Sequence, residues 1–446
     1  MPYFPNTESD RQAMLEAIGA ATIDELFAMI PAELRTKRDL CVKPGLGELE
    51  LTAHLAELAG RNAHAGQSVC FLGGGSYDHF IPAVVDMVSS RSEFYTAYTP
   101  YQAEASQGSL QAFFEYQTLV CQLTGMDVSN ASMYDCGSAA AEAVLMAAHA
   151  TGRGRVVAAR TVHPEYRHVL QTYLANLGME LVVLDAPAGA VSADEVAAAV
   201  NDQTACVLLQ HPNFFGCLED MERAAAAAHD AGALLVAAVD PISLGLLKRP
   251  GEYGADVVVA EGQSLGNPMA FGGPYLGIMA CREKFLRRMP GRLVGQTVDR
   301  RGNRCWVLTM QTREQHIRRE KATSNICTNQ GLLALRATVY LSLMGPSGMK
   351  RAAELCLQKA RYAAQQLSAL QSISLPFDRP TFKEFVVRVK DRPVELLVER
   401  AKAEGIFAGV PLGRWYPELA DCMLVAVTEK RTREEIDRLA AVLDGR

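Results

Sequence analysis

An aspartate that follows a buried strand carries the clearest chemical signal in this chain of 446 residues. Asp240 comes directly after the apolar run from Ala233 to Val239. Ligands of an open parallel sheet collect at the carboxyl ends of its strands, so a carboxylate there either pairs with a cationic group or caps the next turn. A Schiff base with a carbonyl ligand also needs an amine, yet no lysine lies between Lys248 and Lys284.

This stretch resembles the cofactor half of a pyridoxal phosphate enzyme whose lysine is missing. In such enzymes a residue placed like Asp240 holds the pyridine nitrogen, and a lysine farther along the chain forms the Schiff base. The corresponding window here contains Gln263 and Ser264, and neither side chain is an amine. The resemblance therefore implies chemistry that depends on a partner subunit.

Two more segments are expected at the same edge of the sheet. The loop from Asp135 to Glu142 places small residues around Ser138 before an alanine-rich helix, and its backbone N–H groups could bind a phosphate. The pattern is equally typical of a tightly packed helix start without a ligand. His163 follows the strand at Val156 by one short loop, so its ring could stack on a flat ligand, although a lone histidine is more often a capping residue.

Polar side chains are concentrated in two other places. The segment from Tyr98 to Gly108 is dense in hydroxyl, amide and carboxyl groups, which are costly to bury without partners. It is therefore either exposed or organised around a ligand or a second subunit, and we favour the latter. Residues 313–325 mix charges at i, i+4 spacing, as in Glu314 with Arg318, which predicts a solvated helix face. The hydroxyls and amides of residues 322–329 could meet a phosphate or a neighbouring subunit.

Short apolar runs that alternate with helical patterns position these residues. The runs are apolar on both faces, which predicts a mostly parallel sheet covered on both sides, and so an α/β domain. They begin at residues 155, 181, 205, 233 and 256. Among the helices, Ser109 to Gly125 shows buried-helix spacing, and Thr22-x-x-Glu25 and Ser192-x-x-Glu195 are capping boxes.

We predict three domains. Residues 1–75 form an N-terminal arm, residues 76–330 the large domain, and residues 331–446 a small C-terminal α/β domain. The last begins with a helix over residues 331–344 that ends at a hinge, Gly345-Pro-Ser-Gly.

Composition limits the class of protein. The content of 49% hydrophobic residues predicts a globular protein. The net charge is −6 and the sequence has no basic patch that would suit nucleic acid, so we expect no nucleic-acid binding. There is no signal-peptide pattern and no long apolar span, which predicts a cytoplasmic protein that does not enter the membrane. The 11 cysteines show no metal-ligand spacing, so neither a disulfide framework nor a metal site is expected.

Several passages together resemble the glycine cleavage system P-protein family, that is, glycine dehydrogenase (decarboxylating), and within it the subunit 1, or alpha, type. The passages are Tyr98-Thr-Pro-Tyr-Gln with Ser106-Gln-Gly, Asn130-Ala-Ser-Met-Tyr-Asp, Gly262-Gln-Ser-Leu-Gly, Phe271-Gly-Gly-Pro, and the long motif of residues 311–328. The likeness covers almost the whole chain, and the last motif is highly specific.

The resemblance implies a fold-type I pyridoxal phosphate transferase architecture within a heteromeric enzyme, an α2β2 assembly. That enzyme decarboxylates glycine and passes the aminomethyl group to the lipoyl arm of the H-protein. It also implies that subunit 2 (beta) holds the pyridoxal phosphate and its lysine. Ser138, His163 and Asp240 would then be vestigial cofactor contacts. The residues expected to reach the neighbouring active site are Tyr98, Tyr101, Gln102, Glu104 and Gln107.

Two other interpretations stay open at this point. The chain could be a structural scaffold or docking platform for the lipoyl carrier, with no residue in any active site. It could also be a self-sufficient pyridoxal phosphate lyase or aminotransferase that uses Lys248 or Lys321. Lys248 lies only eight residues after Asp240, and Lys321 lies well past the sheet, which argues against the second.

Overall fold

A computed structural model describes residues 6–38, 40–327 and 329–445. It divides into two compact units, Met1–Ala63 and His64–Arg446. The predicted boundaries at residues 75 and 330 remain predictions. Thr328, which belongs to the long family motif, lies outside the described residues.

The N-terminal unit consists of short helices. They are α1 (Glu8–Ala17), the 3-10 helix η1 (Ile23–Phe27) and α2 (Glu48–Gly60). Thr22 caps η1 by accepting a hydrogen bond from the Glu25 N–H, which confirms the capping signal at that position. Large apolar side chains are exposed throughout this unit, for example Met29 at 87% and Leu49 at 80%.

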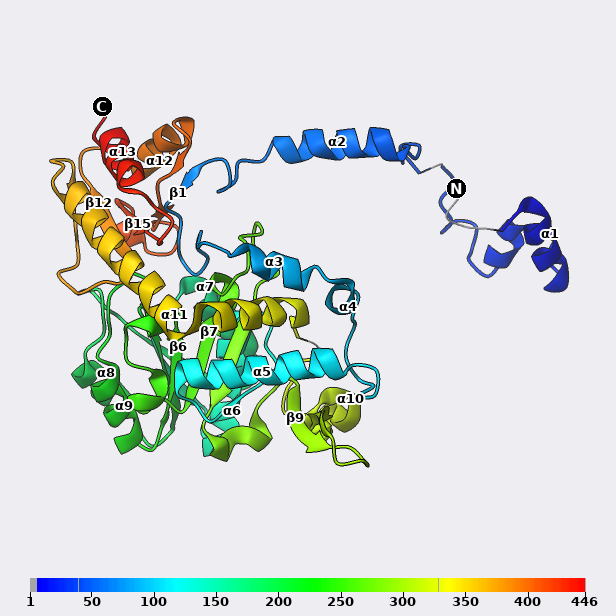
Figure 1. Cartoon of the computed structure of the whole chain (residues 1–446), viewed down its shortest axis with the longest axis horizontal. Coiled ribbons are helices and arrows are strands. Elements are labelled where there is room, and N and C mark those ends of the chain that lie inside the picture. Colours follow the sequence, from blue (N-terminus) through cyan, green and yellow to red (C-terminus); the bar gives the residue numbers. More distant parts are fainter. Residues whose placement is uncertain (1–5, 39, 328, 446) are drawn as a thin grey trace. The chain divides into compact units, whose positions relative to one another are not determined.

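The second unit is built around a seven-stranded sheet with the strand order β2-β8-β7-β6-β5-β3-β4 (Figure 1). Strands β4, β3, β5, β6 and β7 run parallel, whereas β8 is antiparallel to β7 and β2 antiparallel to β8. Their bounds are β2 Val128–Ser129, β3 Arg155–Ala159, β4 Glu180–Leu184, β5 Thr204–His211, β6 Leu234–Val239, β7 Val257–Glu261 and β8 Gly277–Cys281. The mostly parallel sheet predicted from the apolar runs is confirmed.

Helices connect and cover these strands. They are α3 (Ala83–Ser89), α4 (Ser92–Tyr95), α5 (Gln107–Thr124), α6 (Cys136–Thr151), α7 (Pro164–Leu174), α8 (Ala193–Ala199) and α9 (Met221–Asp230). Helix α6 packs against β5 to β8, and α5 packs beside α11 (Gly331–Ser368). As the sequence predicts, α5 ends at Gly125, which adopts a φ of 70°, and Ser192 forms a complete capping box.

A smaller sheet holds the C-terminal part of the chain. Its strand order is β11-β12-β15-β14, all antiparallel, with bounds β11 Ile373–Ser374, β12 Glu384–Val389, β15 Cys422–Ala426 and β14 Val410–Pro411. Helices α12 (Val394–Ala403) and α13 (Arg433–Asp444) share a hydrophobic core with β12, β15 and the second half of α11. Helix α11 breaks at Gly345, whose φ is 56°, where the hinge was predicted.

Two small pairings complete the fold. Strand β1 (Val69–Cys70) runs parallel to β13 (Ile406–Phe407), and β9 (Leu293–Val298) forms a hairpin with β10 (Arg304–Thr309). The predicted solvated helix of residues 313–325 is wrong in part. Only α10 (Gln315–Arg318) and short 3-10 turns form there, and Glu314 is buried with its carboxylate 3.5 Å from His316 Nδ1. No helix among the described residues is long and apolar enough to cross a membrane.

Candidate functional site

Asp240 lies where the sequence predicts it, at the carboxyl end of β6, and it has a cationic partner. Its Oδ2 is 2.9 Å from Nζ of Lys383, the residue just before β12. Its Oδ1 accepts a hydrogen bond of 3.1 Å from the Ile242 N–H. Lys383 is only 1% exposed, so this ion pair is shielded from water. The carboxylate therefore both pairs with a cation and caps the next turn.

Two aromatic rings complete the surroundings of the Lys383 ammonium. The Tyr77 ring centroid lies 3.4 Å from Nζ, a cation–π contact. His79 Nε2 lies 3.0 Å from Nζ and can accept a hydrogen bond from it. A lysine buried this deeply keeps its charge only when such partners replace water. Asp240, Tyr77 and His79 provide them.

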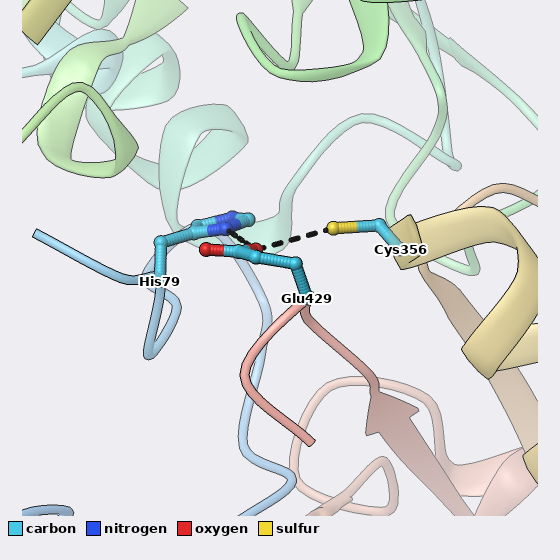
Figure 2. Close-up of side chains that lie close together, drawn as sticks. All are labelled: His79, Cys356 and Glu429. Atoms are coloured by element: carbon cyan, nitrogen blue, oxygen red, sulfur yellow. Dashed lines mark hydrogen bonds and ion pairs between the residues drawn. The ribbon is translucent and has the colours of Figure 1, made fainter. Parts of the chain in front are cut away.

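His79 continues the chain of polar contacts to Glu429 (Figure 2). His79 Nδ1 lies 2.6 Å from Glu429 Oε2, and the Phe80 N–H donates a 2.7 Å hydrogen bond to Oε1. When Nε2 accepts from Lys383, the ring proton sits on Nδ1 and is donated to Glu429. Burial would raise the pKa of Glu429, but the contacts with His79 and the Phe80 N–H lower it below the usual range.

Cys356 brings a thiol to the same place, and its Sγ lies 3.4 Å from Glu429 Oε2. His79, Cys356 and Glu429 thus offer three potential metal ligands within 4.8 Å of one another. Both ring nitrogens of His79 are already engaged, one of them with the Lys383 ammonium. Burial also raises the pKa of the Cys356 thiol well above its usual value, which disfavours the thiolate that a metal requires. The cluster reads as a hydrogen-bonded junction.

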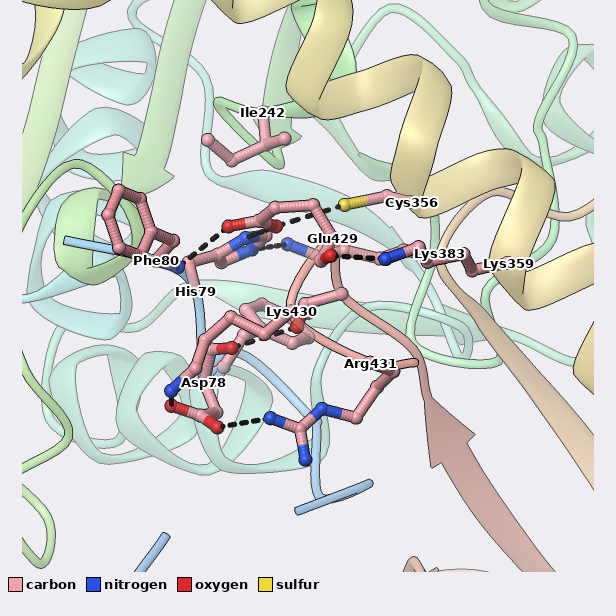
Figure 3. A network of polar contacts seen from close by, with 12 residues as sticks. Asp78, His79, Phe80, Ile242, Cys356, Lys359, Lys383, Glu429, Lys430 and Arg431 are labelled. Atoms are coloured by element: carbon pink, nitrogen blue, oxygen red, sulfur yellow. Dashed lines mark hydrogen bonds and ion pairs between the residues drawn. The ribbon is translucent and has the colours of Figure 1, made fainter. Parts of the chain in front are cut away.

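A second charged junction lies beside the first (Figure 3). Asp78 accepts hydrogen bonds from Lys430 at 2.6 Å and from Arg431 at 2.9 Å. The segment just before α3 is therefore fixed to the segment between β15 and α13 by both Asp78 and His79. These contacts explain why residues so far apart in the sequence surround Asp240.

Glu384 holds the glycine run at residues 73–75 against the small sheet. Its carboxylate accepts hydrogen bonds from the Gly74 N–H at 2.7 Å and from the Tyr77 hydroxyl at 2.8 Å. Burial raises the pKa of Glu384 to about 7. The backbone of Glu384 also lies close to Gly216. A Cβ added at Gly216 would lie 1.9 Å from the Glu384 carbonyl oxygen, so this close approach requires a glycine at position 216.

The predicted phosphate-binding loop does start a helix, but carboxyl groups already accept hydrogen bonds from two of its N–H groups. Asp135 caps α6 by accepting a 2.7 Å hydrogen bond from the Ser138 N–H. Glu261, the last residue of β7, accepts a 3.2 Å hydrogen bond from the Cys136 N–H. The Ser138 hydroxyl points back to the Asp135 carbonyl at 3.0 Å. Burial raises the pKa of Glu261 to about 8 against the effect of its backbone hydrogen bonds.

His163 lies at the start of α7 and is also engaged within the chain. Its Nε2 lies 2.7 Å from the Gly74 carbonyl oxygen, and its ring stacks on Tyr166 with centroids 4.3 Å apart. Phe214 meets the ring edge to face at 4.8 Å. Burial lowers the pKa of His163 to about 4, so the imidazole is neutral at pH 7.

The structure thus brings Ser138, His163 and Asp240 to one edge of the sheet. The cavity left between Asp240, Glu261 and Tyr166 has a volume of about 30 Å³. One ordered water molecule needs roughly 10–15 Å³ on the same measure. The three residues lie at one edge of the sheet as the sequence predicts, but the cavity beside Asp240 does not fit a pyridoxal phosphate.

The other mid-chain lysines do not line this cavity. Lys248 is paired with Glu222 and Lys284 with Asp256, and both side chains are more than half exposed. Lys321 is exposed as well. Ser264 is buried, and its hydroxyl has no hydrogen-bond partner among the described residues.

The polar segment that starts at Tyr98 is placed elsewhere, before α5. Tyr98 is 89% exposed, Tyr101 is 52% exposed, and Gln102 and Glu104 are exposed too. Tyr101 still has a partner, because Arg292 donates a 3.0 Å hydrogen bond to its hydroxyl and lies over its ring. A cavity of about 170 Å³ adjoins Tyr98 and reaches the first turn of α11.

Gln107 differs from its neighbours because both ends of its amide are used. Its Nε2 donates to the carbonyl oxygens of Ala103 and Trp306, each at 2.8 Å, and its Oε1 accepts from the Trp306 N–H at 2.9 Å. The side-chain amide therefore bonds to the backbone of β10 at Trp306 through both its donor and its acceptor. It holds the β9–β10 hairpin against α5.

A model of the glycine cleavage system P-protein family matches residues 1–443. The chain belongs to this family. It is 56% identical over 443 residues to the probable glycine dehydrogenase (decarboxylating) subunit 1 of Desulforamulus reducens, with 99% of each chain covered. It is 54% identical over 445 residues to the protein of the same name from Carboxydothermus hydrogenoformans, with 100% of each covered.

Solved structures agree with this P-protein family membership. The crystal structure of glycine decarboxylase (P-protein) of the glycine cleavage system, in inhibitor-bound form, is 42% identical and matches with a TM-score of 0.91 over 100% of this chain and 99% of that one. A sphingosine-1-phosphate lyase of Burkholderia pseudomallei, 16% identical with a TM-score of 0.67 over 92% of each chain, shares the fold. The predicted fold-type I pyridoxal phosphate transferase architecture is confirmed.

Lys383, the cation that pairs with Asp240, could not be identified from the sequence. Lys383 lies more than 140 residues after Asp240 and outside every passage that carries the family likeness. It precedes an apolar strand, where a lone lysine is ordinarily a solvated end residue. Only the folded chain brings it to the carboxyl end of β6. No sequence window around Ser264 contains Lys383.

Proposed function

We propose that this chain is the alpha-type subunit of a heteromeric glycine decarboxylase. The complex decarboxylates glycine and transfers the aminomethyl group to the lipoyl group of an H-protein, and subunit 2 holds the pyridoxal phosphate. One observation carries this assignment of the cofactor to the partner. The carboxylate of Asp240 is paired with Lys383, and the adjoining cavity of about 30 Å³ has no room for the cofactor.

The exposed polar segment supplies this chain's contribution to the partner's active site. Tyr98, Tyr101, Gln102 and Glu104 present hydroxyl, amide and carboxyl groups on one short stretch before α5. Such groups can contact glycine or close the partner's pocket and exclude water, which strengthens electrostatic interactions there. Gln107 has a positioning role, because its amide is fully engaged with the hairpin and α5.

The N-terminal arm is the second proposed contact with a partner. Exposed apolar side chains are frequent between Met14 and Leu58. Apolar surface of this extent is typical of a protein–protein contact. We assign residues 1–75 to the arm, 76–330 to the large domain and 331–446 to the small domain. We also place the complex in the cytoplasm, with glycine, subunit 2 and the lipoylated H-protein as its partners.

Tyr98→Ala tests the active-site role in the reconstituted complex. Loss of one ordering contact of about 1.4 kcal/mol lowers the rate about tenfold, so we expect exchange of labelled carbon dioxide with glycine to fall at least that far. Size-exclusion chromatography should show an intact complex. Tyr95→Ala is the matched control, since Tyr95 is also an exposed tyrosine (67%) beside the same cavity.

The outcome also decides between the two main interpretations. Reduced turnover for Tyr98→Ala alone, in an intact complex, supports participation in the partner's active site. Unchanged turnover for both variants favours the scaffold or docking interpretation. Loss of the complex in both variants assigns this segment to subunit contact.

A further inference from the structure

A pyridoxal phosphate site must satisfy three demands, and this chain meets each with its own atoms. The pyridine nitrogen needs a carboxylate, the phosphate needs free N–H donors at a helix start, and the ring needs a flat partner. Here Lys383 takes the carboxylate of Asp240. Glu261 and Asp135 accept hydrogen bonds from the Cys136 and Ser138 N–H groups at the start of α6. We call this set of residues, with His163 and Tyr166, the self-filled site.

The placement of Lys383 excludes a role as a Schiff-base lysine. In a pyridoxal phosphate site the aspartate contacts the ring nitrogen, whereas the lysine joins the carbon on the opposite side of the ring. One carboxylate therefore cannot touch both the nitrogen and the lysine of the same cofactor. Lys383 Nζ lies 2.9 Å from Asp240 Oδ2, which is the position of the ring nitrogen and not that of the lysine.

The ring partner is supplied in the same way. His163 would offer its face to a cofactor, but Tyr166 stacks on it at an interplanar angle of 19°. Its Nε2 is bound to the Gly74 carbonyl oxygen, which fixes the ring. A flat ligand that stacked on the same face would have to displace Tyr166.

The ammonium group also links parts of the fold that a bound cofactor could otherwise join. Lys383 leads into β12 of the small sheet, and Asp240 directly follows β6 of the large sheet. His79 extends the contact to Glu429, beyond β15 (Figure 3). The chain Asp240–Lys383–His79–Glu429 thus fastens the small sheet to the large one with alternating polar groups.

We propose that the Lys383 ammonium stands in for the pyridinium of a cofactor, so that the self-filled site is a permanent internal cation site that joins the two sheets. The inference rests on the proposed function, because it treats Asp240 as a former cofactor contact. It predicts a ligand class that the site accepts once Lys383 is shortened, namely a small primary alkylammonium ion. It also predicts that the unaltered site rejects pyridoxal derivatives.

The test uses the full chain and its thermal unfolding midpoint. Lys383→Ala is expected to lower the midpoint by several degrees, because it leaves Asp240 buried without a cation. Propylammonium chloride should raise the midpoint of this variant in a saturable way and more than an equal concentration of potassium chloride. Asp240→Asn/Lys383→Ala, which needs no cation, is the matched control and should not respond to the amine beyond the salt effect.

The results that overturn the proposal are equally specific. They are an unchanged midpoint for Lys383→Ala, an equal response of the single and double variants to the amine, or saturable binding of pyridoxamine 5′-phosphate to the unaltered chain by calorimetry. If Lys383→Ala does not fold, recovery of folded protein in the double variant supports the proposal, and its failure in both contradicts it. These measurements involve no glycine turnover, so a failure here is distinct from a failure of the proposed function.

Discussion

Gln107 is the residue for which the structure makes the sharpest distinction between catalysis and positioning. Its amide makes two hydrogen bonds to the backbone of Trp306, at 2.8 and 2.9 Å, and one to Ala103. Gln107→Leu keeps much of the side-chain volume but removes all three. The N–H and C=O of Trp306 are left without these partners on the side that faces α5.

The expected cost follows from these contacts. Each hydrogen bond contributes about 1 kcal/mol net, and an unsatisfied buried group costs about 1–3 kcal/mol, with partial solvation of this half-buried site reducing the total. We expect Gln107→Leu to lower the free energy of unfolding by about 2 kcal/mol. Urea denaturation of the isolated chain, followed by circular dichroism, measures it.

Turnover of the reconstituted complex completes this experiment. A positioning residue predicts that the loss of activity follows the loss of stability. The same should hold for Gln107→Glu, which keeps the acceptor for the Trp306 N–H but turns an oxygen toward the carbonyl oxygens of Ala103 and Trp306. Gln111→Leu, one turn further along α5, is the control, because Gln111 is bonded only to exposed Glu115. A large loss of turnover in Gln107→Leu with unchanged stability would contradict the positioning role and support direct participation of Gln107 in the partner's active site.

Three further predictions concern the junction between the two sheets. Asp240→Asn and Lys383→Met should each lower the free energy of unfolding, measured by urea denaturation, by about 3–5 kcal/mol. The double variant should lose less than either single variant, because a buried charge is unpaired only in the single variants. Additive losses would contradict a direct ion pair. The pKa of Glu384 is raised to about 7 from an ordinary 4.5, so the unfolded chain releases the carboxyl proton at a lower pH than the folded chain does. The stability relative to Glu384→Gln should therefore fall by up to about 3 kcal/mol as the pH rises from 4.5 to 7. A pH-independent difference would show that the carboxyl group is ionised throughout. Gly216→Ala should lower the free energy of unfolding by at least about 3 kcal/mol more than Gly302→Ala. Both glycines have a φ of 80°, but only at Gly216 would a new Cβ meet the backbone, 1.9 Å from a carbonyl oxygen. Equal unfolding midpoints for the two variants would argue against this close approach.

Much of the fold could be predicted from the sequence because its signals are local. Apolar runs indicated the parallel strands, glycine marked the end of α5 and the break at Gly345, and Ser192 with Glu195 marked a helix start. The same kind of signal failed for residues 313–325. Charge spacing alone cannot show that Glu314 is buried, since burial depends on segments distant in the sequence.

The candidate site was predictable in its positions but not in its state. Asp240 and His163 were located by the rule that ligand groups follow the strands of a parallel sheet. The ammonium that fills the site comes from Lys383, before a strand of the other sheet, and no spacing rule connects it with Asp240. The role of Gln107 was hidden for the same reason, because its partner is the backbone of Trp306, 199 residues away.

The central feature of the proposed function is that this chain holds no cofactor of its own and works through subunit 2. The most direct test is to incubate the purified chain, alone and together with subunit 2, with pyridoxal phosphate, and then to reduce each sample with borohydride. Mass spectrometry of the intact chains shows which of them carries the cofactor, and labelled carbon dioxide exchange reports glycine turnover. We predict that colour, label and turnover appear only when subunit 2 is present and that the label is on subunit 2. A borohydride-fixed cofactor on this chain, at Lys383 or any other lysine, would contradict it.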